Sequence, residues 1–99
     1  MKTAIELIAE ERHRQIEVEG FSSDNDDKYK NGELVTAGRA YATPPDMRCC
    51  MDTENPEHWP WEESWWKPTP DDRIRELVKA SALFAAEIDR LLRKLEREL

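Results

Sequence analysis

The tryptophans and the cations that follow them are the residues of this sequence best suited to ligand chemistry. The stretch HWPWEESWWKP, residues 58–68, holds all four tryptophans of the chain, and basic residues follow it. Indole rings stack on nucleobases, and cations bind phosphates. We therefore predict a nucleotide-binding site. Its candidate residues are Arg12, Trp61, Trp65, Trp66, Lys67, Arg73, Arg75 and Lys79.

The same residues also have a structural interpretation. Tryptophans of a small protein commonly belong to its core, and basic residues on a helix commonly form a solvated face. Arg12 falls on an otherwise apolar stripe. It either points into the same cavity as the tryptophans or pairs with an acid.

Acidic residues offer an alternative site of another kind. A Mg²⁺ site assembled from single acids on different helices would use Glu11, Glu33 and Asp72. The aspartates of residues 24–27 do not form an EF-hand, because the positions that need glycine and glutamate hold Tyr29 and Val35.

Cysteine chemistry and other enzyme motifs have little support. Cys49 and Cys50 are adjacent in the chain, and adjacent cysteines rarely bridge each other. Only His13 and His58 accompany them, so zinc spacing is absent and we expect reduced cysteines. The sequence also lacks a Gly-x-Ser-x-Gly motif and a phosphate-binding glycine loop.

Size and charge restrict the class of protein. The 99 residues predict one domain, residues 1–99, and 37% of them are charged. A net charge of −7 argues against non-specific nucleic-acid binding. No apolar run approaches the roughly 18–20 residues of a membrane span, and acids interrupt the N-terminus where a signal peptide is apolar. We therefore expect a cytoplasmic protein with no membrane partner.

Three main helices are expected, at residues 4–18, 32–42 and 70–97, so the predicted fold class is all-α. Thr3 and Glu6 form a capping box, while Thr69 is expected to cap the third helix with Pro70 at its first position. Residues 21–32 are a polar connection. Residues 43–69 form a long tryptophan-rich loop, whose length suggests a function.

The third helix also suggests self-association. Its apolar residues recur at steps of three and four from Ile74 to Leu99. Within it the segment ASALFAA, residues 80–86, carries no charge on any side and must be buried all round. Two other short helices barely suffice to cover it, so we predict a homo-oligomer formed through helix 70–97.

Two resemblances add expectations. The segments AEERHRQIEVEGF, GELVTAGRAYA, WPWEESWWKP and RELVKASALFAAEIDRL resemble a family of small uncharacterised proteins encoded by phages, prophages and bacteria. This resemblance covers nearly the whole chain. It implies a phage-type accessory protein, acting in the host cytoplasm if phage-encoded, and implies no activity.

The helical layout also resembles the all-α, MazG-like nucleotide pyrophosphohydrolases. Their pattern needs Glu-Glu-x-x-Glu on one helix and Glu-x-x-Asp on the next, to hold Mg²⁺. Glu10 and Glu11 begin such a motif, but His13, Arg14 and Gln15 follow, and no helix holds a matching pair.

Three functions therefore remain. The first, which we favour, is a non-catalytic anti-defence protein that binds and sequesters a nucleotide or cyclic-nucleotide signal. The second is a Mg²⁺-dependent nucleoside triphosphate pyrophosphohydrolase. The third is an acidic inhibitor of a nucleic-acid-binding host or defence enzyme, which the net charge favours.

Overall fold

The described part of the chain is helical, which confirms the all-α prediction. The computed structural model describes residues 1–50 and 59–99, except the side chains of Cys49 and Cys50; our expectations for these cysteines and for His58 lie outside the described residues. Within the described ranges there is no strand. The elements are α1 (Ala4–Glu17), α2 (Ser23–Asp26), α3 (Glu33–Ala42), η1 (Pro45–Cys50), η2 (Glu63–Trp65) and α4 (Arg73–Arg97).

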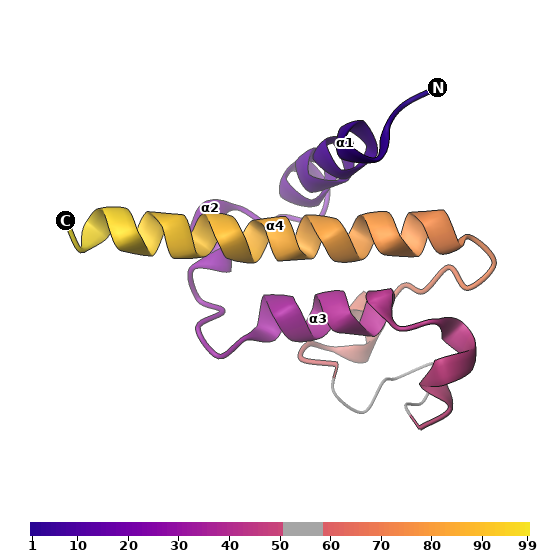
Figure 1. Cartoon of the computed structure of the whole chain (residues 1–99). Coiled ribbons are helices and arrows are strands. Elements are labelled where there is room, and N and C mark those ends of the chain that lie inside the picture. The colour runs from indigo at the N-terminus through magenta and orange to yellow at the C-terminus, as the bar shows by residue number, and fades with distance from the viewer. Residues whose placement is uncertain (51–58) are drawn as a thin grey trace.

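Helix α4 is the central element. Helices α1 and α3 lie on different sides of it, and α2 also contacts it (Figure 1). The close approach of α3 depends on Gly38, because a Cβ at this position would lie only 2.5 Å from a ring carbon of Phe84. The small residue at this position of α3 thus allows a close helix neighbour.

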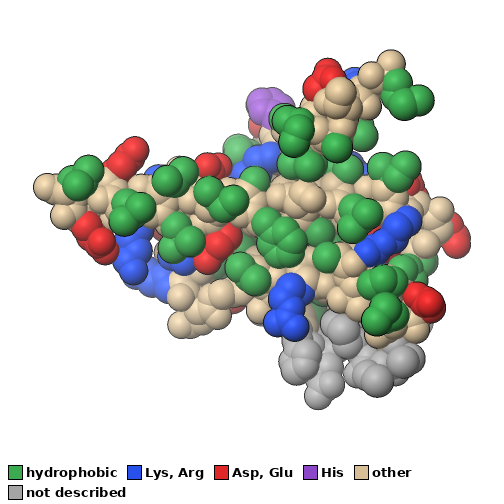
Figure 2. Space-filling model, in the orientation of Figure 1, with side chains coloured by type: hydrophobic (Ala, Val, Ile, Leu, Met, Phe, Trp, Pro, Cys, Tyr) green, Lys and Arg blue, Asp and Glu red, His purple; other side chains and the backbone are tan. Residues whose placement is uncertain are grey.

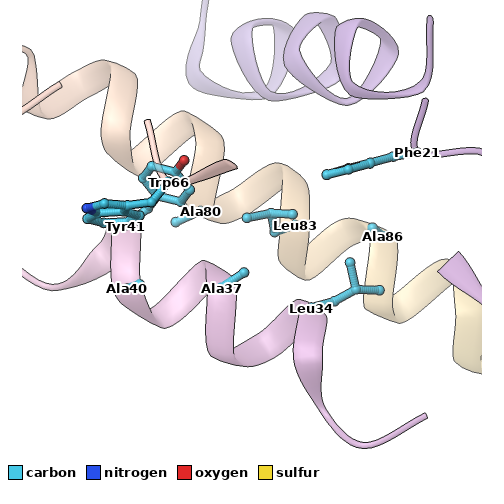
Figure 3. Close-up of a cluster of buried hydrophobic side chains, with 9 residues drawn as sticks. All are labelled: Phe21, Leu34, Ala37, Ala40, Tyr41, Trp66, Ala80, Leu83 and Ala86. Atoms are coloured by element: carbon cyan, nitrogen blue, oxygen red, sulfur yellow. The ribbon is translucent and has the colours of Figure 1, made fainter. Parts of the chain in front are cut away.

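The core lies between α3 and α4. Figure 3 shows Leu34 and Leu83 in the space between these helices, and Trp66 beside the ring of Tyr41. The uncharged residues Ala80, Ala82, Leu83 and Ala86 are at most 2% exposed. The chain itself therefore covers most of segment 80–86. Part of the cover comes from the tryptophan segment, because Trp66 belongs to the same core cluster.

The capping box of α1 is confirmed, but the apolar stripe of this helix does not form its buried face. Thr3 and Glu6 exchange the expected hydrogen bonds. Ile5 and Ile16 are 75% and 41% exposed, whereas the buried residues of the helix are Glu11 and Gln15. The physical reason is that α1 covers a polar pocket, in which arginine partners neutralise the buried acid.

Helix α4 begins at Arg73, three residues later than predicted, and Thr69 does not cap it. Its N-cap is Asp72, whose side chain accepts a hydrogen bond from the backbone N–H of Arg75 at 3.0 Å. The preceding residues form a turn instead, in which the N–H of Asp72 donates to the carbonyl of Thr69 at 2.8 Å. Proline favours the second position of such a turn, and Pro70 occupies it.

One side of α4 remains uncovered. Ile74, Leu77, Ile88, Leu91, Leu92, Leu95 and Leu99 are exposed. Figure 2 shows hydrophobic side chains along this helix, whose C-terminal end extends beyond the other elements in Figure 1. Within the described ranges, no helix combines the length and the apolar character needed to cross a membrane.

Candidate functional site

A pocket opens where α1, α3 and α4 meet the tryptophan segment. Its cavity volume is about 50 Å³, and the pocket is partly open to solvent. Buried side chains form its interior, and partly exposed ones form its rim. The residues that line it are Glu11, Arg14, Gln15, Glu19, Phe21, Tyr41, Trp59, Trp61, Trp65, Lys67, Lys79 and Leu83.

Aromatic rings form one wall of the pocket. Trp61 is the ring at the centre of this wall, because it lies 5.4 Å from Trp59, 5.7 Å from Phe21 and 6.0 Å from Trp65. The indole N–H of Trp59 donates to the carbonyl of Glu62 at 2.9 Å, which fixes that ring. Trp65 is 44% exposed, so part of its ring surface is open to a ligand.

The carboxylate of Glu11 organises the opposite side. It accepts two hydrogen bonds from Arg14, at 2.8 and 2.9 Å, and forms an ion pair of 2.6 Å with Arg75. Burial alone would raise the pKa of Glu11, but the hydrogen bonds from Arg14 and the charges of both arginines outweigh it and hold the pKa below its usual value. Glu11 is therefore ionised although it is buried.

Lys79 joins the tryptophan segment to the core. Its ammonium donates to the carbonyl of Lys67 at 2.9 Å and lies 5.4 Å from the ring centroid of Tyr41. The hydroxyl of Tyr41 accepts from the N–H of Lys67 at 3.1 Å, so the backbone of Lys67 is held from both sides. Burial, and then the charge of Arg75, lower the pKa of Lys79.

Positive charge exceeds negative charge around the pocket. Three cations, Arg14, Lys67 and Lys79, line it together with two acids, Glu11 and Glu19. Glu19 is itself paired, with Arg14 at 3.0 Å and with Lys67 at 3.4 Å. In a chain of net charge −7, this local excess makes the pocket the more favourable place for an anion.

Four of the candidate residues meet at this pocket. They are Trp61, Trp65, Lys67 and Lys79, and Arg75 touches it through its ion pair with Glu11. The sequence placed these residues in one connection and on one helix. The structure adds that they share one space.

The other three candidates do not line the pocket. Arg12 pairs with the buried Asp26 at 2.8 Å, which is the second of the two roles expected for it. Trp66 packs on Tyr41 in the core, with ring centroids 4.7 Å apart. Arg73 donates to backbone carbonyls at the end of α3, among them those of Tyr41 and Ala42.

The acids of the alternative metal site are engaged separately. Glu11 is held by arginines, Glu33 accepts from the N–H of Asn31 at 2.7 Å, and Asp72 caps α4. Among residues 1–50 and 59–99, no three His, Cys, Asp or Glu side chains gather to hold a metal ion.

Sequence reasoning missed the contribution of α1 and α3. Gln15 and Arg14 were assigned to no site, and Tyr41 was assigned to the packing of α3. One signal was available for α1, since Glu11 and Gln15 are four residues apart and must lie on one helix face. The sequence analysis assigned this face no role, because nothing in the sequence indicates that Arg75 comes to lie beside Glu11.

Comparisons with protein-family models, with curated proteins and with solved structures found no match for this chain.

Proposed function

We propose that this protein binds a nucleotide or cyclic-nucleotide signal in the aromatic pocket and holds it intact, as a phage-type anti-defence protein would. The observation that carries the proposal is the meeting of an aromatic wall with an excess of cations in an otherwise acidic molecule. These two features match the two halves of a nucleotide, the base and the phosphate.

The aromatic wall supports binding of the base. Stacking of a base on an aromatic side chain contributes about 1–3 kcal/mol. Trp65 offers an exposed ring face for this contact, and Trp61 and Trp59 continue the wall toward the interior.

The cations support binding of the phosphate. An ammonium group has three N–H donors, and Lys79 gives one of them to the carbonyl of Lys67. Lys67 and Arg14 add charge at the rim of the pocket. A phosphate there gains charge-assisted hydrogen bonds, which are about twice as strong as neutral ones.

The state of the acids favours sequestration over hydrolysis. Glu11 and Glu19 are the two carboxylates of the pocket, and both are paired with cations. The pKa of each is held below its usual value, by hydrogen bonds and charges that outweigh burial. A carboxylate of lowered pKa is a poor general base at neutral pH.

The binding test uses the whole chain and a panel of nucleoside triphosphates, cyclic dinucleotides and cyclic ADP-ribose isomers, with Mg²⁺ present. The protein is filtered away, and both the filtrate and the material released by denaturing the protein are separated by HPLC. We expect one nucleotide to be depleted from the filtrate and recovered intact. A new product peak would show that the protein hydrolyses the nucleotide, which would refute sequestration. An unchanged panel would refute nucleotide binding and leave the acidic inhibitor.

Variants of pocket residues test whether the ligand binds in this pocket. Trp65→Ala and Lys79→Met should each raise the dissociation constant by about 5- to 150-fold, which corresponds to about 1–3 kcal/mol of binding free energy. Lys30→Met is the matched control, because Lys30 is exposed and does not line the pocket. Equal affinities for all three variants and the wild-type chain would place the ligand elsewhere.

We propose further that the chain associates with a second copy through α4. The exposed residues Ile74, Leu77, Ile88, Leu91 and Leu95 recur at the spacing of a coiled-coil seam. Such a seam is complementary to a helix of the same pattern, and α4 of a second copy supplies that helix.

A further inference from the structure

Two residues that line the pocket each carry a buried polar atom with no partner among the described residues. These atoms are Oε1 of Gln15, a residue that is only 4% exposed, and Nε1 of Trp61. A buried polar group without a partner destabilises the free protein, so a ligand that satisfies both atoms gains affinity.

The orientation of the Gln15 amide is fixed by its neighbour. Its Nε2 donates to the carboxylate of Glu11 at 3.2 Å. Glu11 is ionised and can only accept hydrogen bonds, because Arg14 and Arg75 hold it as an anion. Rotating the amide by half a turn would place oxygen against oxygen. The free atom is therefore the acceptor Oε1.

This arrangement specifies what the ligand must present. Opposite Gln15 it needs an N–H or O–H donor, and opposite Trp61 it needs an acceptor. A phosphate oxygen is excluded beside Gln15, because it would face Oε1 with the charge of Glu11 behind it. The phosphate is left to the cations at the rim, Lys67 and Arg14.

We propose that Gln15 and Trp61 read the edge of the nucleobase, with Gln15 accepting a hydrogen bond from an amino group of the base. This inference rests on the proposed function. The neighbours of Trp61 favour a flat heterocycle over the sugar, because the rings of Phe21 and Tyr29 lie 5.7 and 5.0 Å from it. Gln15 is then the residue that determines specificity, and Glu11 positions it.

The test compares matched nucleotides that differ by one amino group. The pairs are ATP with purine riboside triphosphate, CTP with 2-pyrimidinone riboside triphosphate, and GTP with inosine triphosphate. For the base that the protein prefers, we expect the amino-bearing member to bind the wild-type chain about 5- to 150-fold more tightly. In Gln15→Met, which keeps the length of the side chain and removes the acceptor, this ratio should fall to about one.

Further variants separate specificity from folding. Trp61→Phe keeps an aromatic ring but removes the N–H together with the pyrrole half of the indole, so it should weaken binding of both members of a pair equally. Glu11→Gln should reduce the discrimination ratio while Gln15 is still present, which a purely structural role would not do. Circular dichroism checks that each variant is folded.

The outcomes are distinguishable. If no nucleotide of the panel binds the wild-type chain, both the proposed function and this inference are refuted. If both members of every pair bind equally well, nucleotide binding stands and the inference is overturned. It is also overturned if affinity follows removal of a ribose hydroxyl in 2′- and 3′-deoxy analogues and is insensitive to the amino group.

Discussion

Arg48 and Glu76 form an ion pair that is buried almost completely. Arg48 donates to the Glu76 carboxylate at 3.0 Å and to the carbonyls of Ala40 and Tyr41 at 3.1 and 3.0 Å. The same carboxylate accepts from the N–H of Thr69 at 3.1 Å. This one pair therefore joins η1, the end of α3 and the turn before α4.

Loss of the Arg48 guanidinium should destabilise the fold strongly. Arg48→Met would leave Glu76 with only the partly exposed Arg73 as its cation. Breaking a buried pair in this way costs about 3–5 kcal/mol, and urea unfolding followed by circular dichroism measures it. The exposed Arg39→Met should change stability by less than about 0.5 kcal/mol. Similar values for the two variants would contradict the network.

Glu11 should make the stability of the fold depend on pH in the acidic range. Its pKa is lower in the folded than in the unfolded chain, so the unfolded chain binds its proton first as the pH falls. The stability that Glu11 contributes is present above its ordinary value of 4.5 and is lost as the pH falls through the folded pKa. The wild-type chain should therefore lose more stability than Glu11→Gln between about pH 6 and about pH 3.

This comparison isolates Glu11 from Asp26, whose pKa is shifted in the opposite direction. Burial raises the pKa of Asp26 more than Arg12 lowers it, so the contribution of Asp26 to stability increases as the pH falls. Asp26 is present in both proteins and cancels in the difference. Parallel profiles for the two proteins would mean that Glu11 is not held by the arginines.

At the scale of elements, the start of α4 can be tested by two substitutions. Asp72→Ala removes the observed N-cap and should cost about 1 kcal/mol. Thr69→Val replaces a buried hydroxyl that has no partner among the described residues, so it should be neutral or slightly stabilising. Urea midpoints of the two variants decide between the caps. A loss of stability in Thr69→Val alone would show that Thr69 caps the helix, as the sequence predicted.

The helices could be predicted because their signals are local. The capping box at Thr3 and the repeat of apolar residues along α4 depend on neighbours in the sequence, and both were read correctly. The buried face of α1 could not be predicted in this way. Glu11 is neutralised by Arg14, which is near in sequence, and also by Arg75, which is far along the chain. No local pattern records the contact with Arg75.

At the scale of the whole molecule, the exposed side of α4 predicts self-association. The wild-type chain should elute as a dimer, with the mass measured by light scattering. Leu91→Lys combined with Leu95→Lys should give a monomer, because both residues lie on the exposed seam. Ile5→Lys is the matched control, since Ile5 is also an exposed apolar residue but lies on α1. A monomeric wild-type chain would refute the pairing.

The pocket is formed by the packing of several helices, so only part of it can be predicted from the sequence. The tryptophans and Lys67 are close in sequence and could be assigned to one site. Gln15 and Tyr41 reach the same pocket from other helices, and only the packing of α1 and α3 on α4 places them there. Trp66 illustrates the converse, since it adjoins Trp65 in sequence but is buried in the core.

The spacing of the tryptophans has an optical consequence. Trp59 lies 5.4 Å from Trp61 and 5.1 Å from Trp66, and Trp65 lies 6.0 Å from Trp61. At these separations, excitation absorbed by one indole passes to the next before it is emitted. Since the chain has four tryptophans and all lie here, its ultraviolet emission comes from one coupled chromophore. Quenching any one ring therefore darkens the whole protein.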